Sequence, residues 1–337
     1  MRQKNAEMSN CGKVYDGSDS LYDRSEYWGR VRHSYKLYGP WNLMYSNKEL
    51  IAMNSELKDY KQHLLTKKYT SEQLWDMKYA VMSNLHPETE QPVTAFFRWS
   101  AIGLRNIPPI FFLSILPPTT GNQIFGQAIN QTLNFGTNIC NSSATNILDI
   151  KQTAIAYTLS VTSAIAGSVG LRALLTKLRL PGLLGRSLIA CTPYLGLVTA
   201  STVNLFFSRS RDLTEGIFVI DPKTGEKSET VKSKACGALA FRDGVALRWL
   251  VPISIFVFPP ILVRFFDKRL KIYKRRVPRL LIDALIAYTT ISGSLVVAMA
   301  VFNPMGSIRY QRLEEGVKEA LGGEFDDDQL IYFYKGI

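Results

Sequence analysis

The sequence of 337 residues has few of the side chains that build metal centres or disulfide frameworks. It contains three histidines and four cysteines, and the cysteines are far apart at Cys11, Cys140, Cys191 and Cys236. Neither type is clustered at the spacing of a metal site, so we expect no metal ligands and no disulfide framework. The sequence also lacks a glycine-rich phosphate loop and a nucleophile at motif spacing from a base. It therefore predicts a protein that is not an enzyme and that has no catalytic residues and no cofactor.

The first 20 residues lack the apolar core of a secretory signal. They also contain Glu7, Asp16 and Asp19, and such acidic residues are not typical of a cleaved mitochondrial presequence. We therefore expect any targeting information to be internal.

Charged side chains are nearly absent from several long segments. Four of these segments are each about as long as the roughly 20 residues that cross a bilayer core. They are 153–171, 187–207, 245–263 and 281–302. A fifth segment, 106–118, reaches this length only if it extends back past Arg105, to about 100–118. A soluble core of this size could not easily bury them all, so we expect an all-α multi-span membrane protein with about five transmembrane helices.

The spans divide the chain into three parts. Residues 1–92 form a polar N-terminal region with helical patterning, 93–303 the membrane domain, and 304–337 a C-terminal tail. Between the third and fourth spans, a short apolar run precedes the turn signal at 221–225, which predicts a small hairpin. Pro252, Pro259 and Pro260 are expected to break the fourth span into pieces.

The formal net charge of +12 is unevenly distributed. With five crossings, the basic loops after the second and fourth spans lie on the side of the N-terminus, and the acidic tail lies opposite. The positive-inside rule then places the N-terminus in the cytoplasm or the mitochondrial matrix. The basic stretch 269–279 could bind RNA, but its place between two spans favours a loop that faces lipid headgroups. We therefore expect the lipid bilayer, and no nucleic acid, as a partner.

The stretch "GQAINQTLNFGTNICNSS" at 126–143 is rich in side-chain amides. On a helix of 3.6 residues per turn, amides at offsets of four, three, four and three share one face. These amides are Gln127, Gln131, Asn134, Asn138 and Asn141. The spacing predicts a polar ribbon that either binds a polar ligand or ties helices together.

Several motifs, in their order along nearly the whole chain, resemble those of the sideroflexins. They include "YDRSEYWGR" at 22–30, "LWDMKYAVMSNLHPET" at 74–89 and the C-terminal "YFYKGI". The residues that match the family's motifs include His86, Pro87, Thr89, Asn130, Gln131, Asn134, Asn138, Asn141, Asn204, Arg209 and Gly216. One departure is Leu247, which stands where the family has a serine before the retained Arg248.

This resemblance implies a transporter of serine or related small amino acids in the mitochondrial inner membrane, with the N-terminus in the matrix and the C-terminus in the intermembrane space. The candidate substrate-binding residues are Asn130, Gln131, Asn134, Asn138, Asn204 and Arg248. Arg248 could hold a carboxylate or extend to the membrane interface. Asp283, inside the fifth span, could carry a proton or pair with a loop arginine, and His86 is expected to be structural. The alternative function is a sideroflexin-like structural or assembly subunit of a respiratory-chain complex that does not transport.

Overall fold

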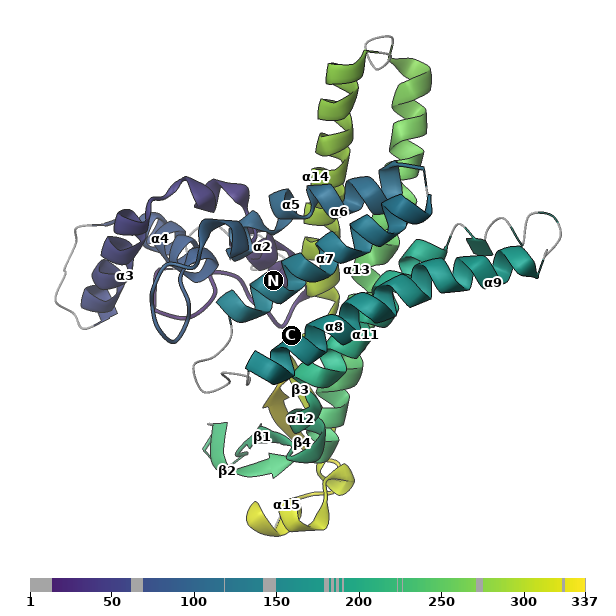
Figure 1. The fold of residues 1–337 in the computed structure, drawn as a ribbon. Coiled ribbons are helices and arrows are strands. Elements are labelled where there is room, and N and C mark those ends of the chain that lie inside the picture. The colour runs from purple at the N-terminus through teal and green to yellow at the C-terminus, as the bar shows by residue number, and fades with distance from the viewer. Residues whose placement is uncertain are drawn as a thin grey trace, which may run out of the picture.

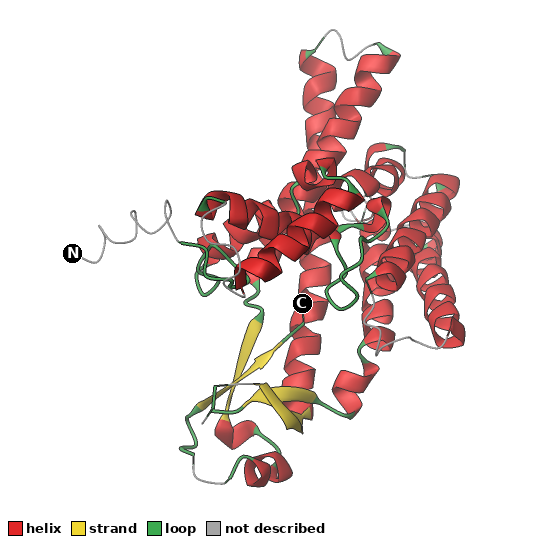
Figure 2. Ribbon diagram, turned by 90° about the vertical axis from the view of Figure 1, so that its left-hand side faces the viewer, coloured by secondary structure: helices red, strands yellow, loops and turns green. Residues whose placement is uncertain are grey.

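The computed structural model describes residues 14–61, 69–117, 119–141, 150–178, 182, 185, 188–189, 191–222, 224–225, 227–270, 275–322 and 325–336. Helices make up most of this part of the chain, and the strands gather at one end of it (Figures 1 and 2). The expected helical character is therefore confirmed. The term all-α is wrong, because a small sheet is present as well.

The N-terminal region folds into short helices around its own core. Its elements are α2 (Tyr27–Leu37), η1 (Pro40–Met44), α3 (Asn47–Lys61) and α4 (Ser71–Asn84). A capping box starts α4, because the Thr70 side chain accepts from the Gln73 amide and the Gln73 side chain accepts from the Thr70 amide. Trp75 and Tyr79 from α4 lie in the core of this region, which follows from the apolar face of the helix.

Buried His33 links α2 to α4. Its Nδ1 lies 3.0 Å from both the Ser20 hydroxyl and the Tyr79 hydroxyl. Burial and, to a smaller extent, the nearby Arg24 guanidinium lower the pKa of His33 to about 4, against the opposing effect of Asp19. The folded region therefore holds the neutral imidazole, whereas the unfolded chain takes up a proton below its ordinary pKa of 6.5.

We expect the N-terminal region to lose stability as the pH falls from about 6.5 to about 4, by up to ~3 kcal/mol. Above pH 6.5 the imidazole of His33 is neutral in both the folded and the unfolded state, so its protonation no longer lowers the stability. Hydrogen exchange of α2 and α4, corrected for the intrinsic rates, would measure the effect. The variant His33→Gln should have a flatter profile in this pH window, and an equally steep profile in the variant would show that another group titrates.

Residues 95–115 form a broken helical segment rather than one continuous span. The pieces are η2 (Ala95–Phe97), η3 (Trp99–Ala101), α5 (Ile102–Arg105), α6 (Ile107–Ile110) and η4 (Phe111–Ile115). Pro108 and Pro109 cannot donate backbone hydrogen bonds, which explains why regular helix geometry is interrupted here. After Thr119, α7 (Thr120–Cys140) runs back antiparallel to this segment, since Gly126 packs on Leu113 and Gly136 on Phe97.

A second helical pair follows, formed by α8 (Ile150–Ile165) and α11 (Thr192–Ser208). The chain continues from α8 through η6 (Ala166–Gly170) and α9 (Leu171–Lys177), and from α11 into α12 (Ser210–Thr214). The pair packs closely at small residues: a Cβ on Gly196 would lie only 2.6 Å from the Ala164 carbonyl oxygen. Small residues on both helices therefore allow their backbones to approach closely.

The longest helices are α13 (Lys234–Arg269) and α14 (Arg276–Val301), which pack against each other. Contrary to expectation, the three prolines leave α13 as one continuous helix of 36 residues. Within the described residues, three helices are long and apolar enough to cross a membrane: Tyr157–Lys177, Lys234–Arg269 and Arg276–Val301. A count of about five spans is therefore not confirmed, and the broken segment explains part of the difference.

The sheet joins the loop after α12 to the C-terminal tail. Its strands are β1 (Ile217–Ile220), β2 (Lys227–Ser233), β3 (Met305–Arg309) and β4 (Leu330–Tyr334), in the antiparallel order β2-β1-β4-β3. The predicted hairpin is β1–β2. The tail strands alternate between exposed and buried residues, and Ile331 and Phe333 enter a shared core. α15 (Glu315–Ala320) covers this core through Val317.

The N-terminal region lies at the end of α14 that leads into the tail (Figure 1). There Arg30 Nε donates to the Ala300 carbonyl at 2.7 Å. Arg275 and Arg276 of the basic stretch lie at the opposite end of α14. The predicted placement of the N-terminus on the side of the basic loops stays a prediction. It depends on 100–118 being a full crossing, and Gly103 in this broken segment packs beside Tyr288, within α14.

Candidate functional site

Helix α7 has no charged residue, and one of its faces carries a row of buried amides. Gln123, Gln127 and Gln131 follow one another at four-residue spacing and are at most 2% exposed. Asn130 lies beside them and is 8% exposed. The local sequence explains the helix, because Thr119 caps it by accepting from the Asn122 amide and no proline interrupts it. We call these four side chains the amide row.

Several polar atoms of the amide row have no hydrogen-bond partner among the described residues. They are Nε2 and Oε1 of Gln123, Oε1 of Gln127, Nδ2 of Asn130 and Nε2 of Gln131. A buried polar group without a partner destabilises a fold by about 1–3 kcal/mol. Four neighbouring amides with such atoms are therefore unusual, and each such group calls for an explanation.

One bond ties the amide row to the rest of the helices. Gln127 Nε2 donates to the Pro193 carbonyl in the first turn of α11, at 3.1 Å. α7 also packs against α8, where the Ser160 hydroxyl is buried and likewise lacks a partner among the described residues. The row is thus enclosed by helix packing and offers both hydrogen-bond donors and acceptors without a formal charge.

The structure places the other predicted amides differently. Asn134 is half-buried on α7, and the side chain of Asn138 lies outside the described residues. Asn141 ends the helix, where its amide donates to the Phe97 and Thr137 carbonyls at 3.2 and 2.9 Å. Asn141 therefore has a structural role in joining α7 to the broken segment.

Arg248 and Asn204, both predicted site residues, meet between α13 and α11. Arg248 Nη1 donates to the Ser201 carbonyl at 3.0 Å and lies 3.4 Å from Asn204 Oδ1. Eleven residues of helix separate Asn204 from Pro193, which corresponds to about 16 Å along α11. The structure therefore brings Arg248 and Asn204 together. This pair lies farther along α11 than Pro193, which binds Gln127.

Two other candidate residues have local partners. Asp283 is buried, and its carboxylate lies 3.8 Å from Arg279 Nε one helical turn earlier, so it pairs with an arginine of the first turn of α14 and not with one in a loop. His86 Nδ1 accepts from the backbone amides of Glu88 and Thr89, both at 3.2 Å. Exposed Pro87 lies within this turn. These contacts fit a structural role for the histidine.

The sequence analysis did not identify two buried polar residues, Gln123 and Arg105. Gln123 lies four residues before Gln127, so the same helical spacing would have found it. Arg105 is buried, and its Nη1 makes only a long contact of 3.4 Å to the Arg98 carbonyl. No sequence signal identified this arginine as buried, because its burial follows from the fold of the broken segment against α7. The described residues hold no group of three or more possible metal ligands.

Comparison with known proteins identifies the family. The model of the family described as sideroflexins matches residues 16–337. Sideroflexin FSF1 of Saccharomyces cerevisiae is 30% identical, over 96% of this chain and 97% of its own length. Sideroflexin-3 of Rattus norvegicus is 28% identical, over 94% of this chain and 96% of its own length. No solved structure matches. Because the match covers nearly the whole chain, including the charge-free helix and its amides, this protein belongs to the sideroflexin family.

Proposed function

We propose that this protein transports serine or a related small neutral amino acid across the mitochondrial inner membrane, and that the amide row forms part of the substrate path. The supporting observation is the set of unpaired donors and acceptors on the charge-free helix α7. A site that binds a polar ligand accounts for buried amides that have no partners among the described residues.

The row is chemically matched to a zwitterion. The unpaired N–H groups of Gln123, Asn130 and Gln131 can donate to a carboxylate, and the unpaired oxygens of Gln123 and Gln127 can accept from an ammonium group. Neutral amides do this without placing a full charge in a medium of low dielectric constant. Such a site should discriminate against ligands with a net charge, since an unpaired charge is expensive to bury.

Transport by this route requires the helices to move. The amide row is almost fully buried, so the row must open before a substrate can reach it. Separation of α7 from α11 would open it, and the bond from Gln127 to the Pro193 carbonyl would then break. Asn204, farther along α11, and Arg248 of α13 form a second polar site on the proposed path.

Uptake of labelled serine into proteoliposomes tests the proposal. We expect saturable uptake, with competition by alanine and glycine and little competition by aspartate or lysine, because these two carry a net charge. Absence of uptake of any small neutral amino acid by well-folded protein would contradict transport. Co-migration of such a protein with a respiratory-chain complex on a native gel would instead support the assembly-subunit function.

A further inference from the structure

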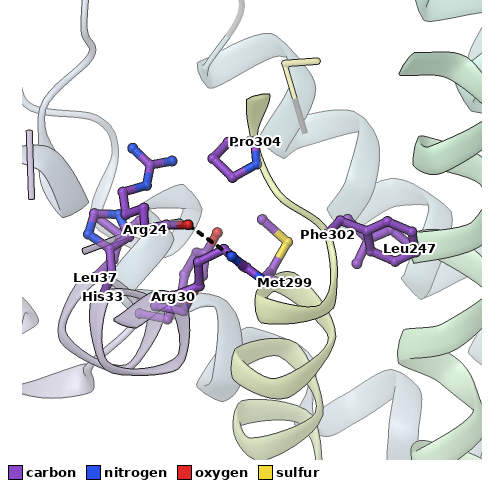
Figure 3. Close-up of a pocket in the computed structure, with 10 residues that line it drawn as sticks. Arg24, Arg30, His33, Leu37, Leu247, Met299, Phe302 and Pro304 are labelled. Carbon is purple, nitrogen blue, oxygen red and sulfur yellow. Dashed lines mark hydrogen bonds between the residues drawn. The ribbon is translucent and has the colours of Figure 1, made fainter. Parts of the chain in front are cut away.

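A pocket of about 110 Å³ lies between the N-terminal region, the C-terminal end of α14 and Leu247 within α13 (Figure 3). Arg24, Arg30 and Tyr38 line it from the N-terminal region, and Leu247, Met299 and Phe302 line it from α13 and the end of α14. No residue of α7 lines this pocket. Leu247, which replaces a family serine, therefore belongs to this pocket.

The two arginines differ in what they bind. Arg30 donates to the Ala300 carbonyl through Nε and to the Arg24 and Ser25 carbonyls through Nη1, at 2.7, 2.9 and 2.6 Å. Figure 3 shows the bond from Arg30 to the Arg24 carbonyl. Arg30 thus fixes the turn at Arg24 against the end of α14. The Nε of Arg24, by contrast, is buried without a hydrogen-bond partner among the described residues.

The turn that carries Arg24 depends on close backbone packing. A Cβ on Gly29 would lie 1.7 Å from the Asp23 carbonyl oxygen, so only glycine allows α2 to approach this turn. Gly29 and Arg30 both belong to the motif "YDRSEYWGR" at 22–30, which is separate in sequence from the amide row on α7. The motif therefore builds one wall of the pocket.

The pocket lining is positive, since it contains two arginines and no carboxylate. Within the described residues, neither arginine forms an ion pair with an acidic side chain. Burial raises the pKa of Tyr38 to about 12, so its hydroxyl keeps its proton and can donate. A guanidinium with a free N–H is suited to bind phosphate or carboxylate oxygens.

We propose that this pocket binds an oxyanion, either the phosphate of an anionic lipid headgroup or a free phosphate. The volume corresponds to three or four waters at about 30 Å³ each, which suits such a group and not a whole lipid. Met299 and Phe302 form an apolar wall beside the arginines, along which acyl chains can lie. The bound oxyanion would join the N-terminal region to α14 through Arg24.

The test uses the full-length protein in uncharged detergent. Thermal unfolding is measured with inorganic phosphate against chloride at equal ionic strength, and native mass spectrometry is used to count bound phosphatidylglycerol and phosphatidylcholine. We expect Arg24→Gln to weaken binding about tenfold or more, since it removes a charge-assisted hydrogen bond. The control is Arg32→Gln, which removes the same charge from an exposed position of α2 and should bind as the wild type does.

Stabilisation by phosphate, lost in Arg24→Gln, would identify a site for a free oxyanion. Selective binding of phosphatidylglycerol alone would identify the lipid headgroup as the ligand. No binding of either probe, or equal binding by the two variants, would overturn the proposal. Should Arg24→Gln fail to fold, Arg24→Lys preserves the charge, and partial binding by this variant would support the proposal. Wild-type affinity in Arg24→Lys would contradict the need for the guanidinium fork.

Discussion

Replacing Gln123 with leucine is expected to reduce serine uptake roughly 10- to 100-fold, the effect of removing hydrogen bonds from a buried polar ligand. The protein itself should be at least as stable as the wild type. Gln123 is 1% exposed, and neither of its amide atoms has a partner among the described residues. Leucine has a similar volume and needs no hydrogen bond, so the substitution removes an unsatisfied polar group from the interior.

The two expected effects have opposite signs, which separates function from structure. If the amides hold helices together, Gln123→Leu lowers stability and uptake falls with it. If the row binds substrate, uptake falls while thermal stability stays equal or rises, by up to ~2 kcal/mol. Saturable uptake in proteoliposomes and thermal unfolding in detergent measure the two quantities on the same preparation.

Gln311→Leu is the matched control, because it makes the same chemical change at an exposed position in the C-terminal tail. It should leave uptake unchanged. Normal uptake by Gln123→Leu would place the substrate path elsewhere. The polar site at Arg248 and Asn204 would then be the next region to test.

The second large effect concerns the ion pair that anchors the C-terminus. Asp243→Ala should destabilise the sheet by about 3–5 kcal/mol, because removal of one partner leaves the other charge buried and uncompensated. Asp243 of α13 and Lys335 lie 2.7 Å apart, and their side chains are only 13% and 11% exposed. Lys335 directly follows β4, the strand between β1 and β3.

Detachment of β4 would remove Ile331 and Phe333 from their core, so the loss should be seen in both tail strands. Hydrogen exchange of β3 and β4 measures it directly. Asp328→Ala is the control, since its pair with Arg309 is exposed on both sides and such pairs contribute less than about 1 kcal/mol.

The double variant Asp243→Ala, Lys335→Met provides a further check. It removes both charges and should recover much of the lost stability. A double variant as unstable as Asp243→Ala would mean that the aspartate acts through another partner, such as the neighbouring Arg242.

Local sequence patterns predicted the features that depend on neighbouring residues. The charge-free runs predicted long apolar helices, the spacing of Gln127 and Gln131 predicted a shared helix face, and the turn signal at 221–225 predicted the β1–β2 hairpin. These predictions succeeded because helix periodicity and turn chemistry are properties of short segments. The extent of the buried amide row was not predicted in full, since Gln123 was overlooked.

The amino-acid sequence by itself determined that this chain forms apolar helices, one of which carries a face of amides, and that it has the motifs of a sideroflexin. Only the tertiary structure decided which amides are buried without partners among the described residues, that Arg24 and Leu247 line the same pocket, and that the tail strands pair with a distant hairpin. These features depend on contacts between residues far apart in the chain. Burial and hydrogen-bond satisfaction are set by those contacts and not by local periodicity.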